Sequence, residues 1–384
     1  MRYLRYGCAH LSVCTAAFLA TGVLAESGEP IKLGAPLILS GPGAFAGEAS
    51  KRTIDLLLEE VNAGGGVDGR PVEMVYYDTE GKPDVAVRVV NRLVKSDQVD
   101  AVLGPIASWE AVAVKQVLDR AGVPTLMLSA TRKSVDPQTS CMFKLPVDDA
   151  IVVARLFEYA RAQGWTKVAV ISSQDGFGDG GHRELVGQAE GAGIEIVFDE
   201  QFSMEETDLA PLLNKVKRSE AQALINWSSS RAPVIVTNTH RQVGMEIPLI
   251  HSHAALSPAV LAGTGQNGEG MYAVGAKFEA ADNLPDSDPQ KAVILEYRAT
   301  YEEAFGEQPN QFGAGAYDAF KVLMAAIDAA DSTEPEAVCA AIEATEGYVG
   351  LGGVYSYAQD DHAGLGTNSV VVYAVSDGSW QVVE

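Results

Sequence analysis

From residue 31 onward, short apolar runs alternate with longer amphipathic stretches. The runs have the length of buried strands, and the stretches have the period of helices that bury one face. This alternation predicts parallel sheets covered by helices on both faces. In the first half we expect strands at 31–39, 72–77, 99–103 and 124–128 and helices near 47–63, 82–96 and 108–121.

A second set of the same kind follows. Its strands are expected near 167–172, 194–198, 222–227 and 248–251, and its helices near 149–163, 177–192, 208–218 and 230–243. The two sets have a matching pattern. An expected helix begins at Ser108 and another at Ser230, and each is followed by a glycine, Gly122 or Gly244, fourteen positions later. Serine at a helix start and glycine just past its end fit capping preferences. The pattern predicts an α/β fold with two doubly wound parallel-sheet lobes.

The pattern changes after residue 277. We expect helices at 288–305, 313–330 and 334–346, a glycine-rich strand at 350–356, and a hairpin of 370–375 and 379–383 turned by Asp377-Gly378. The late helices should return to the first lobe and the last strands should join the second, so the chain crosses repeatedly and forms a multi-strand hinge. The predicted division is 26–146 plus 277–354 for lobe 1, and 147–276 plus 355–384 for lobe 2.

The N-terminus has the pattern of a secretory signal peptide. Arg2 and Arg5 precede an apolar run at 11–21, and small residues precede the polar stretch that starts at Glu26. The run is too short to span a bilayer core of ~30 Å. We therefore predict that residues 1–25 are removed and that the protein is periplasmic.

The chain is acidic, with a net charge of −23 and no basic stripe, which makes nucleic acid and anionic membrane surfaces poor partners. Cys141 and Cys339 are the two cysteines that follow the expected cleavage site. An exported protein could pair them, but two cysteines make no disulfide framework, so we expect them to be unpaired.

Polar residues follow several of the expected strands. In open α/β sheets, ligands bind outside the carboxyl ends of the strands, where helix N-termini also favour an anion. Ser108, Ser129 and Thr131 occupy such positions in the first half, and Ser229 and His253 in the second. A single serine there is more simply a helix cap, but their joint placement predicts a clamp for one small carboxylate.

Three other kinds of site fit the sequence poorly. The glycine-rich segment 41–47 imitates a dinucleotide loop, but its spacing is wrong and it contains a proline, so no cofactor is expected. His251 and His253 alternate on an expected strand and so face one way, but a metal needs further ligands and we expect none. Without a nucleophile elbow or an H-E-x-x-H motif, we expect no enzyme.

These segments resemble the type I periplasmic solute-binding proteins of the leucine/isoleucine/valine-binding class over nearly the whole exported chain. The resemblance lies in Leu39–Pro42, Asn62–Pro71, Tyr77-Asp78, Gly104–Ser108 and Ser129–Thr131. Segments 284–287, 316–319, 349–353 and 361–365 resemble a subgroup that includes receptors for aromatic carboxylates. The resemblance implies a monomeric receptor that closes by a hinge and passes its ligand to ABC permease subunits in the inner membrane.

Carried over residue by residue, the resemblance makes Ser108 and Thr131 hydroxyl donors to the ligand carboxylate, with help from the backbone N–H of Ser129. Phe177 falls where the family places an aromatic wall. Ser229 replaces a tyrosine of the amino-acid receptors, and His253 replaces the glutamate that holds the ligand's ammonium group.

That replacement predicts a ligand without an amine, because an unpaired buried charge is costly and histidine supplies no anion. The prediction holds unless Asp78 or Asp175 substitutes for the missing glutamate. We expect the ligand to be an aromatic carboxylate or another organic acid that packs against Phe45, Trp109, Phe177 or Trp227. For Trp109 and Trp227, packing in the hydrophobic core is an equal alternative. Three alternatives remain: an amino-acid receptor of the same fold, a ligand sensor, and an exported enzyme.

Overall fold

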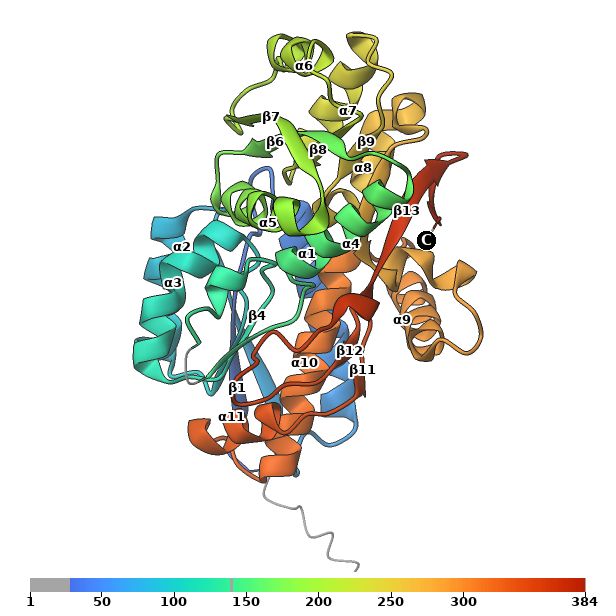
Figure 1. The fold of residues 1–384 in the computed structure, drawn as a ribbon. Helices are drawn as coiled ribbons and strands as arrows, with labels where there is room; N and C mark the ends of the chain where they lie inside the picture. Colours follow the sequence, from blue (N-terminus) through green and yellow to red (C-terminus); the bar gives the residue numbers. More distant parts are fainter. Residues whose placement is uncertain (1–27, 139–140, 384) are drawn as a thin grey trace, which may run out of the picture.

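The computed structural model describes residues 28–138 and 141–383, so the predicted signal peptide lies outside the described residues. The chain forms two sheets that occupy opposite halves of the molecule (Figure 1). We call the half around the first sheet lobe 1 and the half around the second sheet lobe 2, and we keep the predicted residue boundaries as a proposal.

The first sheet has the strand order β2-β1-β3-β4-β5, and all of its pairs are parallel. Helices cover both faces, because one cluster of buried side chains joins Leu103 to α1, α10 and α11, and another joins Val102 to α2 and α3. The strands are β1 (Ile31–Leu37), β2 (Val72–Asp78), β3 (Ala101–Leu103), β4 (Thr125–Met127) and β5 (Met142–Lys144). The helices are α1 (Ala44–Ala63), α2 (Pro83–Arg92), α3 (Ser108–Ala121), α10 (Gln311–Ala330) and α11 (Pro335–Glu343).

The second sheet has the order β14-β13-β10-β9-β8-β6-β7. Its pairs β10–β13 and β13–β14 are antiparallel, and its other pairs are parallel. Val170 faces α4 and α5, whereas Ile171 faces α6 and α7. Both lobes are therefore doubly wound, as predicted. The strands are β6 (Lys167–Ser173), β7 (Glu195–Phe202), β8 (Ala223–Trp227), β9 (Leu249–His251), β10 (Tyr272–Ala276), β13 (Val370–Ser376) and β14 (Ser379–Val382). The helices are α4 (Asp149–Ala162), α5 (Gly176–Ala192), α6 (Ala210–Lys217), α7 (Ala232–Gln242) and α8 (Pro258–Thr264), and α9 (Pro289–Phe305) lies on the path from this sheet back to the first.

The chain passes between the lobes three times: from β5 to α4, from β10 through α9 to α10, and from β12 to β13. Repeated crossing was predicted, but the glycine-rich strand expected at 350–356 is wrong. Two short antiparallel strands stand in its place, β11 (Tyr348–Val349) and β12 (Val354–Tyr355). Gly350, Gly352 and Gly353 lie in the turn between them. The sequence analysis also did not predict β5, β10 and α8. Two of these elements are short, since β5 has three residues and α8 has seven.

The expectation that the cysteines are unpaired is wrong. Cys141 and Cys339 form a disulfide with their Cα atoms 5.4 Å apart, although 198 positions separate them along the chain. The bond joins the entry to β5 with α11, two segments of lobe 1 that sequence distance alone does not bring together.

Candidate ligand-binding site

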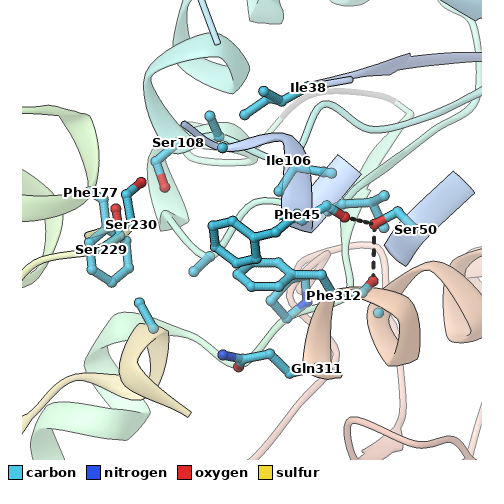
Figure 2. A pocket seen from close by; sticks show the side chains of 18 of the residues that line it. Ile38, Phe45, Ser50, Ile106, Ser108, Phe177, Ser229, Ser230, Gln311 and Phe312 are labelled. Atoms are coloured by element: carbon cyan, nitrogen blue, oxygen red, sulfur yellow. Dashed lines mark hydrogen bonds between the residues drawn. The ribbon is translucent and has the colours of Figure 1, made fainter. Parts of the chain in front are cut away.

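A pocket lies between the lobes, where the carboxyl ends of both sheets face each other (Figure 2). The N-termini of α1, α3, α5 and α10 and the loops after β8 and β9 contribute to its wall. Its lining consists of Ile38, Gly43, Phe45, Ala46, Ser50, Ile106, Ala107, Ser108, Trp109, Leu128, Ala130, Pro146, Phe177, Ser229, Ser230, His253, Ala254, Gln311, Phe312 and Gly315.

Most of the predicted site residues meet in this pocket. They come from both lobes and from segments up to 208 positions apart, between Phe45 and His253. Parallel strands bring their carboxyl ends to one edge, which explains why reading strand ends found them. The residues are Phe45, Ser108, Trp109, Phe177, Ser229 and His253.

Three predicted residues do not line the pocket. Ser129 is fully buried and Thr131 is 1% exposed. A Cβ built on Gly180 of α5 would lie 3.3 Å from the Thr131 hydroxyl, so lobe 2 covers Thr131 directly. Trp227 is also fully buried and stacks behind Phe177 with ring centroids 6.0 Å apart. In this arrangement Trp227 supports the pocket wall from behind.

The serines expected to cap helices do not cap them. Ala107 is the N-cap of α3 and Arg231 that of α7, and neither end has a side-chain cap hydrogen bond. Ser108 is the first residue of α3, and Ser230 precedes α7 in a left-handed conformation. Because no helix end uses these hydroxyls, they are available to a ligand.

His251 and His253 do not face the same way, which corrects the alternating-strand prediction. Strand β9 ends at His251, and His253 opens a 3₁₀ turn that points it into the pocket. His251 is fully buried and hydrogen-bonded to Asn226 (2.9 Å) and Thr237 (2.8 Å). Among the described residues, no group of three or more possible metal ligands lies together.

His253 combines burial with unused hydrogen-bonding capacity. It is 6% exposed, and neither ring nitrogen has a hydrogen-bond partner among the described residues. Burial, with a smaller effect of the Lys144 charge, lowers the pKa of His253 to about 3, so the ring is neutral at physiological pH. A neutral imidazole offers one donor and one acceptor and no charge.

The acids that could substitute for an ammonium-binding glutamate do not line the pocket, although Oδ2 of Asp175 is buried without a hydrogen-bond partner among the described residues. Asp78 accepts from the backbone N–H groups of Leu39 (2.9 Å) and Glu80 (2.8 Å). One oxygen of Asp175 caps α5 through Phe177 and Gly178, at 2.9 and 2.8 Å. Neither Asp78 nor Asp175 lines the pocket.

The end of the pocket away from the serines is apolar; the sequence predicted Phe45 as a ligand contact but did not reveal Phe312. Phe45 and Phe312 meet edge to face with ring centroids 5.5 Å apart. The Ser50 hydroxyl lies 3.0 Å from the Ala46 carbonyl and 3.1 Å from that of Phe312, so it is satisfied within the protein (Figure 2). Phe312 belongs to α10, which returns from far along the chain. Only the fold could identify it.

The lobes touch around the pocket. A Cβ built on Gly176 of α5 would lie 3.0 Å from the Cα of Trp109 in α3, so the two helix N-termini meet at van der Waals distance. Gln311 of α10 donates from Nε2 to the carbonyls of His253 (3.0 Å) and Leu256 (2.8 Å), which ties the His253 turn to lobe 1. A ligand in the pocket therefore contacts both lobes.

Glu110 makes the stability of this region depend on pH. It lies in the first turn of α3 and is fully buried. Burial raises the pKa of Glu110 to about 7 from its ordinary 4.5. The folded protein thus holds this proton more tightly than the unfolded chain, and stability falls as pH rises from about 4.5 to about 7.

We expect Glu110→Gln to reduce the difference in unfolding free energy between pH 5 and pH 8 by about 2–3 kcal/mol. Urea unfolding at both pH values measures this difference. Glu73→Gln, which changes an exposed glutamate of the same lobe, should leave it unaltered. Equal pH dependence in Glu110→Gln and the unmodified protein would contradict the argument.

The two lobes, the repeated crossings and the interlobe pocket define a two-lobed ligand-binding protein. A family model described as "Periplasmic binding protein" matches residues 30–379, and the chain belongs to this family. It is a binding protein and not an enzyme, as predicted. The "Leucine-, isoleucine-, valine-, threonine-, and alanine-binding protein" of Pseudomonas aeruginosa is 26% identical over 353 residues, covering 89% of this chain and 90% of that protein. An "Amino acid binding protein" of the same species is 26% identical over 337 residues, covering 87% of each chain.

Solved structures share the fold. An extracellular ligand-binding receptor from Rhodopseudomonas palustris superimposes with a TM-score of 0.86 at 22% identity, covering 92% of this chain and 99% of that one. A branched-chain amino acid transporter substrate-binding protein from Streptococcus pneumoniae, in complex with isoleucine, gives a TM-score of 0.81 at 21% identity, covering 92% and 99%. Within the described residues, no helix has the length and apolar character needed to cross a membrane.

Proposed function

We propose that this protein is an exported receptor of an ABC importer that captures a small organic carboxylate without an ammonium group. The predicted signal peptide and the family membership support export to the periplasm. In this proposal the hydroxyls of Ser108 and Ser229 and the neutral ring of His253 hold the carboxylate end. The apolar body, aromatic or another organic group, packs against Phe45 and Phe312.

One observation carries the proposal: the described residues that line the pocket include no Asp, Glu, Lys or Arg, and the one histidine, His253, is neutral. An ammonium group in this pocket would lose its water without gaining an opposite charge, which is expensive. A carboxylate can be held by hydroxyl groups and by the N-termini of α3 and α5. Helix N-termini attract anions and repel cations.

The second candidate function is an amino-acid receptor of the same fold. The names of the two Pseudomonas aeruginosa relatives favour it, as does the isoleucine bound in the Streptococcus pneumoniae structure. A ligand sensor would use the same pocket. A neighbouring gene for a permease would favour transport over sensing.

A thermal-shift screen separates the acid from the amino-acid function. We expect at least one of benzoate, phenylacetate and 4-methyl-2-oxopentanoate to raise the melting temperature, and we expect leucine not to raise it. Leucine and 4-methyl-2-oxopentanoate are a matched pair, since they have the same carbon skeleton and differ in the group beside the carboxylate. A large shift with leucine and none with the acids would overturn the proposal.

We expect Ser108→Ala to weaken binding of the best acid from this screen by about 1.5–3 kcal/mol, because it removes a hydrogen bond to a charged group. Titration calorimetry measures the loss. Ser50→Ala is the matched control, because its hydroxyl also borders the pocket but bonds to backbone carbonyls. Unchanged affinity in Ser108→Ala would exclude Ser108 as a ligand contact.

A further inference from the structure

Ser230 has an unusual backbone conformation for a residue that lines a pocket. Its φ is 56°, in the left-handed region that residues with a Cβ rarely adopt. Five other non-glycine residues among those described share this conformation, and all five are exposed: Asp68, Glu80, Gln98, Asp331 and Asp377. Ser230 alone is partly buried and lines the pocket.

The left-handed turn directs the Ser230 side chain toward the other lobe. Figure 2 shows the hydroxyls of Ser230 and Ser108 pointing toward one another, with the Ser229 hydroxyl beside them. Ser108 belongs to α3 of lobe 1, whereas Ser229 and Ser230 follow β8 of lobe 2. None of the three hydroxyls forms a hydrogen bond with another described residue.

A second feature points to a ligand at this end of the pocket. His253 lines the same space, and its ring nitrogens are buried without partners. Buried polar atoms nearly always have a hydrogen-bond partner, and unpartnered ones call for an explanation. Glycine would adopt the left-handed conformation at position 230 without strain, so the turn alone does not account for a serine there. A hydrogen bond from its hydroxyl to a ligand would account for it.

We propose that Ser230 is a ligand contact that, with Ser108, forms a hydroxyl clamp across the two lobes and so determines which ligands close the protein. Each hydroxyl donates one hydrogen bond to the same oxyanion, one from each lobe. The inference rests on the proposed function, which supplies the carboxylate. Non-glycine residues in such conformations cluster at ligand clamps, where the surrounding structure holds them.

Ser230→Gly tests the clamp, because it removes the hydroxyl and relaxes the backbone at the same time. We expect it to weaken binding of the best acid among benzoate, phenylacetate and 4-methyl-2-oxopentanoate at least tenfold in titration calorimetry. The melting temperature without ligand should stay the same or rise. Asp377→Gly, which relaxes the same conformation in the exposed β13–β14 turn, should leave the affinity unchanged.

The outcomes separate this inference from the proposed function. If Ser108→Ala weakens acid binding and Ser230→Gly stays within twofold of the unmodified protein, the clamp is overturned and the proposed function stands. If none of the three acids binds, both fail. If leucine binds instead, the proposed function is overturned, and Ser230→Gly titrated with leucine decides whether Ser230 contacts the ligand carboxylate.

Discussion

His253→Glu should reduce the affinity for an organic acid at least 100-fold. His253 is 6% exposed and neutral, and its ring lies edge-on to Phe177 with centroids 5.3 Å apart. A glutamate there would place a second negative charge beside the bound carboxylate, in a pocket lined mostly by apolar residues. Like charges in such contact cost several kcal/mol, and about 3 kcal/mol corresponds to the expected loss.

The effect should also depend on pH. Burial raises the pKa of a carboxyl group, so the introduced glutamate is more fully ionised at pH 9 than at pH 6. Titration calorimetry at both values should therefore show a larger loss at pH 9. In the unmodified protein His253 is neutral at both values, since its pKa is about 3, but Glu110 ionises between them, so the loss is measured against the unmodified protein at each pH.

His253→Gln is the matched control, because glutamine keeps a neutral donor and acceptor at nearly the same size as glutamate. It should retain acid binding within about tenfold, the cost of one altered hydrogen bond. His253→Glu should in addition gain affinity for leucine, whose ammonium would meet a carboxylate. Equal acid affinity in both variants would show that the ligand carboxylate lies away from residue 253.

Removal of the Cys141–Cys339 disulfide should lower the free energy of unfolding by about 2–5 kcal/mol. The bond closes a loop of the chain between residues 198 positions apart. A bond that closes such a long loop strongly restricts the unfolded chain. In the standard account, its removal destabilises the protein because the unfolded chain regains this conformational entropy. Chemical unfolding of Cys141→Ala/Cys339→Ala against the unmodified protein measures the difference.

Reduced wild-type protein is the control for packing, since it keeps both buried sulfur atoms and lacks only the bond. Its unfolding midpoint should match that of the double variant. If reduction leaves the midpoint unchanged, the bond does not stabilise the fold. Ligand affinity should change little in either form, because neither cysteine lines the pocket.

Much of the site could be predicted because it depends on local features. Ser108, Ser229 and His253 each follow a strand of a parallel sheet, and such positions share one edge whatever the details of packing. Phe177, which the resemblance implied, and Phe45, which was expected to pack against the ligand, lie in the first turn of the helix after the first strand of each lobe. For these residues, the order of elements along the chain is sufficient.

The rest of the site depends on contacts that local patterns do not specify. Thr131 follows β4 and Trp227 is the last residue of β8, yet α5 packs over both because Gly180 and Gly181 let it approach. Phe312 and Gln311 reach the pocket only because α10 packs against α1 of lobe 1. The capping prediction for Ser230 is wrong because the β8–α7 turn needs a left-handed residue.

The sequence by itself determined the two doubly wound lobes, their repeated crossing and the absence of a charged partner at position 253. Periodicity and the order of short segments encode the lobes and the crossing, whereas the missing charge at position 253 is what the family resemblance implied. Only the tertiary structure decided which hydroxyls face the pocket, which aromatic rings form its apolar end, and that Cys141 meets Cys339. Those contacts join segments far apart in the chain, and their geometry depends on how closely two helices or two lobes can approach.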